Sequence, residues 1–172
     1  MKAYRNRKSG FTLIEILIVV IILGILAAIV IPQFTNASQD ARKSSLASQV
    51  QTLKSQVELY KLQHKDLAPQ LITVGWDVFT QYSNIDGGDL GTTADLTATP
   101  PRNLGPYMQA PPVNPLLQLD IIGVLGTTDG SVGWTYDETT GVIHGVVPNK
   151  ANDTWYESDD GVHIFGTNTI ID

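Results

Sequence analysis

The densest group of side chains that could do chemistry is an acidic run near the C-terminus. It consists of Glu157, Ser158, Asp159 and Asp160, followed by a glycine, with Asp153 just upstream. Carboxylate and hydroxyl oxygens are ligands that calcium prefers, and calcium takes about six to eight of them. The spacing of these acids before the glycine differs from that of an EF-hand loop. Two interpretations stay open: a calcium site formed by these five residues, and a solvated acidic turn.

The remaining residues of catalytic or metal-binding type lack the spacing that such sites need. His64, His144 and His163 stand apart from one another, so each is expected to be a surface or packing residue. The sequence has no cysteine, which excludes disulfides, cysteine-ligated zinc and iron–sulfur clusters. It also has no nucleophile elbow, zinc-protease helix motif or phosphate-binding loop. We therefore predict that the protein is not an enzyme and requires no cofactor, with calcium the one candidate ligand.

One further carboxylate, Glu15, stands out by its surroundings. The 24 residues from Ile16 to Gln39 that follow it include no charged residue. A carboxylate at the end of a membrane segment costs free energy, and such residues are usually functional. Alternatively, Glu15 lies at the level of the lipid headgroups, where its charge stays hydrated. The residues alone leave both interpretations open.

The element that must position Glu15 is the apolar segment itself. A helix of this length would extend about 36 Å at about 1.5 Å per residue, which is enough to cross a hydrocarbon core of about 30 Å. Four basic residues precede it, so the N-terminal tip is expected to stay in the cytoplasm. They are Lys2, Arg5, Arg7 and Lys8. A cleavable signal peptide is the alternative, but the residues after Ile31 match its cleavage site poorly.

The start of this segment forms a specific motif, Lys8-Ser9-Gly10-Phe11-Thr12-Leu13-Ile14-Glu15. With the apolar segment that follows, it resembles the N-terminus of type IV pilins and type II secretion pseudopilins, over residues 1–34. The resemblance implies that residues 1–10 are a leader, which a prepilin peptidase removes by cutting after Gly10. The same enzyme would methylate the new amino terminus at Phe11, and Glu15 would be the glutamate required for assembly.

The resemblance also implies where the protein resides and what it binds. It would span the inner membrane once, with its N-terminus in the cytoplasm and its head in the periplasm. It would then enter a periplasmic pseudopilus or an extracellular pilus. Its partners would be further copies of itself in a helical filament, the prepilin peptidase, an inner-membrane assembly platform and minor pilins or pseudopilins.

Two features of the apolar segment gain a role from this resemblance. A buried carboxylate needs a partner, and the Phe11 amine of a neighbouring subunit would supply one to Glu15. Gly24 and Pro32 bracket a stretch of weakened helix. That stretch resembles the part of related subunits that loosens on assembly.

A second helical pattern extends from Ser38 to Lys65, which contains neither glycine nor proline. Its apolar residues recur at alternating spacings of four and three, which places them on one face of a helix. They are Leu46, Val50, Leu53, Val57 and Tyr60. Asp66 to Pro69 should end the helix. The sequence thus predicts one long helix over residues 11–66, with its membrane-spanning part at about 11–34.

Residues 67–172, here called the head, differ sharply in charge and composition. They contain 13 acidic residues against two basic ones, a net charge of −11, so no nucleic-acid partner is predicted for the head. Glycine, proline and threonine residues separate short runs of strand-forming residues, and this pattern predicts β-strands joined by turns. The best hairpin pairs 133–136 with 142–147, and a second apolar pair is Ile121–Leu125 and Val162–Phe165.

The predicted fold class is α+β. The head alone can form only a modest core, so we expect the apolar face of the long helix to cover one face of a small antiparallel sheet. This arrangement is similar to that of pilins. It gives three parts: the leader at 1–10, the long helix at 11–66 and the β-rich head at 67–172.

Three functions remain open from the sequence. The favoured one is a structural subunit of a type II secretion pseudopilus, acting in protein export. The chain lacks the C-terminal disulfide loop of many type IV pilins and carries the acidic run, which favours this function. The alternative is a type IV pilin, whose surface pilus serves adhesion, motility or DNA uptake. A membrane-anchored periplasmic binding domain is an alternative of another class.

Overall fold

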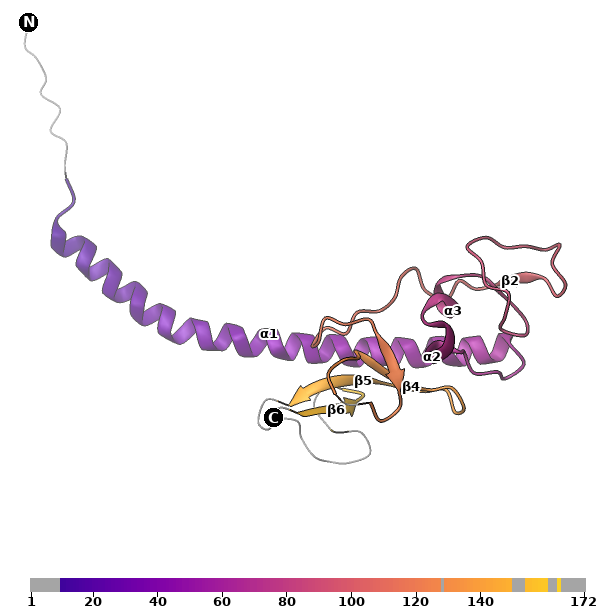
Figure 1. The fold of residues 1–172 in the computed structure, drawn as a ribbon. Helices are drawn as coiled ribbons and strands as arrows, with labels where there is room; N and C mark the ends of the chain where they lie inside the picture. The colour runs from indigo at the N-terminus through magenta and orange to yellow at the C-terminus, as the bar shows by residue number, and fades with distance from the viewer. Residues whose placement is uncertain (1–9, 128, 150–153, 161–163, 165–172) are drawn as a thin grey trace, which may run out of the picture. The chain divides into compact units, whose positions relative to one another are not determined.

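The fold is α+β, as predicted, and the described residues form one long helix and two small sheets (Figure 1). The computed structural model describes residues 10–127, 129–149, 154–160 and 164. The chain divides into two compact units, residues 1–40 and 41–172. Helix α1 (Leu13–Gln63) contributes residues to both units.

The described part of the first unit is almost entirely the N-terminal part of α1. The helix is long and apolar enough to cross a membrane, with a mean hydropathy of 3.3 in its most apolar window. It passes through Gly24 and Pro32 without interruption. The Thr35 hydroxyl donates hydrogen bonds to the carbonyls of Ile31, at 3.3 Å, and Pro32, at 2.8 Å. The predicted weakening therefore does not break the helix in the single subunit.

The C-terminal part of α1 belongs to the second unit and is amphipathic, as its spacing predicted. All five predicted apolar residues are buried, from Leu46 to Tyr60. The helix begins at Leu13 and ends at Gln63, inside the predicted bounds of 11 and 66. It ends early because Lys65 and Asp66 adopt left-handed backbone angles, with φ of 56° and 61°, which an α-helix cannot accommodate.

The main sheet of the head has four strands in the order β3-β4-β5-β6. Their bounds are β3 (Ile122–Val124), β4 (Trp134–Asp137), β5 (Val142–Asn149) and β6 (Thr154–Ser158). Strands β4 and β5 form the predicted hairpin, with Trp134 opposite Gly145 and Asp137 opposite Val142. Strand β6 extends the sheet antiparallel to β5. The hairpin prediction is thus confirmed.

One edge of this sheet differs from the prediction. Strand β3 pairs with β4 in parallel, with Ile122 opposite Trp134, so the sheet is mixed rather than antiparallel. The chain from Leu125 to Gly133 runs back to the starting end of β3, where the Gly133 amide donates to the Ile121 carbonyl at 2.8 Å. Of the expected partner segment, Val162–Phe165, only Ile164 lies within the described residues, and it packs against the core.

The head also contains short elements that the sequence analysis did not predict. They are helices α2 (Leu71–Val74) and α3 (Asp77–Thr80) and an antiparallel sheet of β1 (Ser83–Asn84) and β2 (Arg102–Leu104). The amide groups of Ile72 and Thr73 donate to the Glu138 carboxylate, at 2.8 and 3.0 Å. Helix α2 thus receives its cap from the β4–β5 turn, far away in the sequence, because free N–H groups at a helix start need acceptors.

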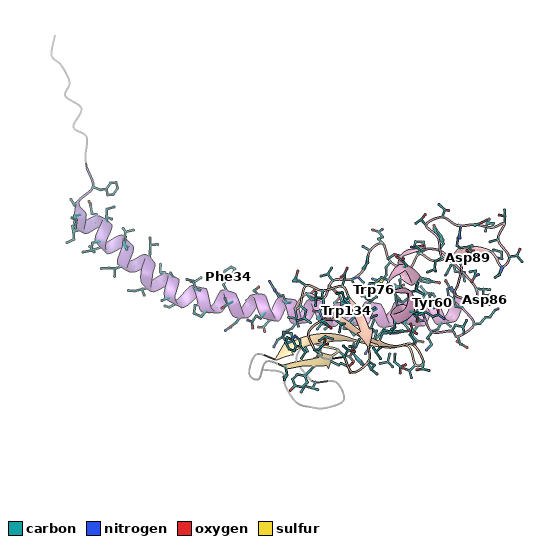
Figure 2. All side chains as sticks on the ribbon, in the orientation of Figure 1. Phe34, Tyr60, Trp76, Asp86, Asp89 and Trp134 are labelled. Carbon is teal, nitrogen blue, oxygen red and sulfur yellow. The ribbon has the colours of Figure 1, made fainter. Side chains whose placement is uncertain are left out.

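The core of the second unit lies where the apolar face of α1 meets the sheet and the short helices. Tyr60, Trp76 and Trp134 are among its largest side chains (Figure 2). The contact is close: a Cβ atom added to Gly145 on β5 would lie 2.7 Å from a methyl carbon of Leu46. Gly145 therefore allows the sheet to approach the helix at this point.

Candidate functional site

The predicted cleavage site lies just before α1. Gly10 and Phe11 precede the first helical residue, Leu13, and the Phe11 side chain is 81 % exposed. A Cβ atom at Gly10 would meet no atom within 4 Å. Proteolytic enzymes need an exposed, non-helical stretch of backbone, and the Gly10–Phe11 bond offers one.

The carboxylate of Glu15 caps the start of the same helix. Its Oε2 atom accepts hydrogen bonds from the backbone N–H and the hydroxyl of Thr12, both at 2.8 Å. In return, the Glu15 backbone N–H donates to the Thr12 hydroxyl oxygen at 3.3 Å. This reciprocal arrangement is a capping box, which satisfies N–H groups that the helix leaves free.

The capping role of Thr12 is not among the features predicted above. The signal was present, because a threonine followed three residues later by a glutamate at a helix start is typical of a capping box. In the isolated chain, Glu15 is thus supplied with donors by its own polypeptide. Its position at the helix start also suits a negative charge, since the helix dipole is positive there.

The helix surface that follows Glu15 is exposed. Its large apolar side chains, from Ile16 to Ile31, are between 49 and 62 % exposed, and Phe34 is 76 % exposed (Figure 2). A helix that is apolar all round requires lipid or other protein around it. This surface can act by insertion into a membrane or by packing against further helices.

The second candidate site, the acidic run, is held by contacts within the head. Asp159 accepts hydrogen bonds from Lys54 and His144, each at 2.7 Å. The Glu157 carboxylate accepts the backbone N–H of Gly126 at 2.6 Å, and the Ser158 hydroxyl donates to Asp160 at 3.1 Å.

These contacts test whether the run fits a calcium ion. Asp159 directs one oxygen to an ammonium and the other to an imidazole N–H, so both face donors. Glu157 binds a loop and not its neighbours in the run. In the part of the chain that the structure describes, no three His, Asp or Glu side chains converge as metal ligands. The described members of the run do not fit a calcium cage; Asp153 lies outside the described residues.

The hydrogen-bond donors Lys54 and His144 control the ionisation of Asp159 in the acidic run. Burial raises the pKa of Asp159, but hydrogen bonds from His144 and Lys54, together with the charges of these side chains, outweigh it. The pKa of Asp159 is therefore held below its ordinary value. Asp159 stays ionised in its half-buried position because two donors from other elements stabilise the charged form.

Both histidines that the structure describes are buried in the head, and both form hydrogen bonds. His64 is fully buried and stacks on Tyr60, with ring centroids 3.7 Å apart. Its Nδ1–H donates to the Tyr60 carbonyl and its Nε2 accepts the Ser83 hydroxyl, both at 2.8 Å. Burial lowers the pKa of His64, although backbone hydrogen bonds at Tyr60 and Asn84 oppose the shift. His144 is also buried, and His163 lies outside the described residues.

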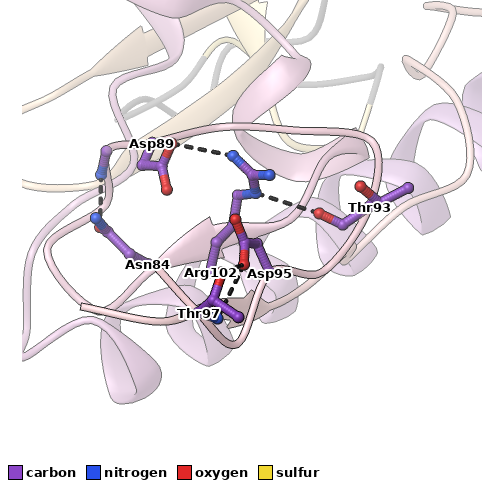
Figure 3. A network of polar contacts seen from close by, with 7 residues as sticks. Asn84, Asp89, Thr93, Asp95, Thr97 and Arg102 are labelled. Atoms are coloured by element: carbon purple, nitrogen blue, oxygen red, sulfur yellow. Dashed lines mark hydrogen bonds and ion pairs between the residues drawn. The ribbon is translucent and has the colours of Figure 1, made fainter. Parts of the chain in front are cut away.

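A polar network fixes the long loop between β1 and β2 (Figure 3). Arg102 donates to the Asp89 carboxylate at 3.0 Å and to the Thr93 carbonyl at 3.2 Å. The Asp95 carboxylate accepts both the amide and the hydroxyl of Thr97, at 2.9 and 2.6 Å. These bonds join residues of the loop to one another and to Arg102 at the start of β2, so the network has a structural role.

Comparison with known proteins finds a family motif at the N-terminus. Residues 5–31 match a family model described as the prokaryotic N-terminal methylation motif. The chain is similar to the type II secretion system core protein G of Dickeya chrysanthemi, with 42 % identity over 57 residues, covering 33 % of this chain and 37 % of that protein. It is also similar to core protein G of Pseudomonas aeruginosa, with 43 % identity over 58 residues, covering 34 % and 41 %.

A third relative matches over a longer stretch. The type IV major fimbrial protein FimA of Dichelobacter nodosus is 34 % identical over 107 residues, covering 62 % of this chain and 65 % of that protein. The chain thus spans less than half the length of the two secretion-system relatives and somewhat less than two thirds of the fimbrial one. No solved structure matches it.

Proposed function

We propose that this chain, which carries the prokaryotic N-terminal methylation motif, is a structural subunit of a helical filament assembled from the inner membrane. The main support for the proposal is that the motif lies at the exposed N-terminal end of α1. The matched residues 5–31 include the accessible Gly10–Phe11 bond, the Glu15 cap and most of the exposed apolar helix surface.

The membrane stage follows from the charge pattern and the helix. The basic residues before Gly10 keep the tip in the cytoplasm, and the apolar part of α1 crosses the membrane once. The head then lies in the periplasm. Prepilin peptidase cuts after Gly10 on the cytoplasmic side and methylates the amine of Phe11. These steps rest on the motif and on the resemblance at residues 8–15.

Assembly would exchange the partners of Glu15. In the single subunit its carboxylate accepts two hydrogen bonds from Thr12. Cleavage creates a cationic amine at Phe11, and a neighbouring subunit brings such an amine to the carboxylate as the helices leave the lipid. A charge removed from water needs this pairing, so the ion pair sets the axial register between subunits.

The exposed apolar surface supplies the driving contact for the filament. Between Ile16 and Ile31 the large apolar side chains are between 49 and 62 % exposed, and lipid covers them before assembly. Helices of other copies replace the lipid in the filament core, and the heads form the outer surface. An assembly platform in the inner membrane and minor pilins or pseudopilins are the further partners that this route requires.

Two kinds of filament are candidates, and a separate observation favours each. A type II secretion pseudopilus is favoured by the 42–43 % identity to core protein G. A type IV pilus is favoured by the fimbrial relative, whose match of 107 residues extends beyond α1 into the head. In the first case the filament acts in protein export, and in the second it serves adhesion, motility or DNA uptake.

The test separates sheared surface filaments from membranes and applies mass spectrometry to both fractions. We expect an N-terminal peptide that begins at Phe11 and carries one methyl group. Abundant processed protein in sheared filaments would identify a pilus, and processed protein confined to the envelope would identify a pseudopilus. Protein that still carries residues 1–10 would refute the filament proposal and favour a membrane-anchored binding domain.

A further inference from the structure

The most unusual contact of the head joins its acidic run to the long helix. The Lys54 ammonium on α1 lies 2.7 Å from Oδ2 of Asp159, and the Nδ1 atom of His144 on β5 lies 2.7 Å from Oδ1 of the same carboxylate. Lys54 is 105 residues away from Asp159 in the sequence. One side chain thus connects the helix, a central strand and the segment that follows β6.

Of the three groups in this contact, His144 is the one that is buried in the core. The His144 side chain is fully buried, while those of Lys54 and Asp159 are each 38 % exposed. His144 lies opposite Asp159 if the β5–β6 register, in which Gly145 faces Ser158, is continued by one residue. Hydrogen bonds to an ionised group are shorter and stronger than neutral ones, and both oxygens of Asp159 have a donor.

The rest of the acidic run is arranged around this contact in a way that does not require a metal. Glu157 accepts a hydrogen bond from the amide of Gly126, which follows β3, and Asp160 accepts one from the Ser158 hydroxyl. A calcium ion needs several of these oxygens to point at a common centre. Each oxygen of Asp159 already accepts a hydrogen bond, one from Lys54 and one from His144, so a calcium ion would have to compete with these donors.

We propose that Lys54 and His144 hold the acidic run in place, in the role that a calcium ion was expected to fill, so that the head is stable without metal. The contact holds the end of β6 against α1. It thereby stabilises the part of the core that lies between α1 and strands β5 and β6. The inference concerns the stability of the head and does not depend on the filament proposal. It makes Lys54 a structural counter-ion rather than a solvated surface lysine.

The first test is thermal unfolding of the full chain in detergent, with calcium chloride and then with EDTA. We expect the same midpoint in both, because protein groups already neutralise Asp159. A midpoint that rises with calcium and falls with EDTA would overturn the proposal and favour the calcium site. The measurement needs no filament, so failure here is distinct from failure of the proposed function.

The second test removes the lysine charge. We expect Lys54→Met to lower the midpoint by about 2–4 °C and to speed hydrogen exchange of the β6 amides several-fold, whereas Lys54→Arg stays near the wild type. Lys61→Met is the matched control, because the ion pair of Lys61, at 3.2 Å, is with Glu58 on the same helix and not with a residue at the end of β6. Equal effects of the two Met variants on β6 exchange would overturn the proposal.

A double-mutant cycle completes the design. If Lys54 acts through Asp159, then Asp159→Asn and Lys54→Met together should cost less than the sum of the two single changes. Additive losses would show that the two residues contribute separately, which contradicts the proposed bridge.

Discussion

The two parts of α1 have opposite surfaces although they belong to one helix. From Ile16 to Ile31 the apolar side chains cover the whole circumference and stay exposed, whereas from Leu46 to Tyr60 they follow one face and are buried by the head. A helix that is apolar on one face can bury that face against its own chain. A helix that is apolar all round must bury its surface in lipid or against other molecules. The difference indicates that the first part requires lipid or other protein around it.

The carboxylate of Glu15 offers the strongest way to test this comparison. We expect Glu15→Leu to insert into the membrane but to give no filament, because an unpaired Phe11 amine in the filament core would cost about 3–5 kcal/mol. Filament yield after shearing measures the effect. Glu15→Gln separates the two roles of the residue, since glutamine keeps the capping box but carries no charge. Normal filament yield from Glu15→Leu would refute the pairing.

Two leucines, one buried and one exposed, test directly whether the two parts of α1 differ in burial. Leu53 is 1 % exposed and Leu23 is 58 % exposed. We expect Leu53→Ala to lower the free energy of unfolding of the head by about 2–5 kcal/mol. Leu23→Ala should change it by less than about 0.5 kcal/mol. Denaturant unfolding in detergent provides the measurement. If both changes lowered the free energy of unfolding by similar amounts, the first part of the helix would also be buried by its own chain.

The capping box predicts a smaller and more local effect. Thr12→Val removes the hydroxyl that bonds Glu15 and should destabilise the first turn of α1 by about 1 kcal/mol. Hydrogen exchange of the first-turn amides in detergent would detect it, while the unfolding of the head stays unchanged. Thr12→Ser keeps the hydroxyl and serves as the control. If Thr12→Ser frays the first turn as much as Thr12→Val does, the box is not what stabilises it.

The smallest expected effect concerns pH and the end of the helix. Because burial lowers the pKa of His64 below its ordinary value of 6.5, the unfolded chain binds a proton more readily than the folded head does. The free energy of unfolding should therefore fall as the pH drops below about 6.5. Denaturant unfolding between pH 7.5 and 5 measures the slope, and His64→Gln should flatten it. An unchanged slope in that variant would exclude His64 as the source.

Features that depend on near neighbours could be predicted from the sequence. The motif at residues 8–15, the apolar segment and the face from Leu46 to Tyr60 follow from residue type and spacing. The β4–β5 hairpin follows from two β-type runs that flank a short turn. The role of Thr12 was predictable in the same way, from the spacing of Thr12 and Glu15, and was missed.

Features that depend on distant partners could not be predicted. The parallel pairing of β3 with β4 is set by the path of the connection between them, and α2 depends on Glu138 for its cap. The composition of the acidic run suggested calcium, but composition does not show which groups the fold brings to a carboxylate. Lys54 reaches Asp159 only in the folded head.

The sequence by itself therefore determined the membrane segment, the processing motif, the amphipathic helix and the central hairpin, because each depends on periodicity and on residues close in the chain. The tertiary structure alone decided the edge of the sheet, the cap of α2 and the partners of the acidic run. Those contacts join segments up to 105 residues apart. Their pairing depends on how the whole head packs, since many alternative partners of the same type exist in the chain and packing selects one of them.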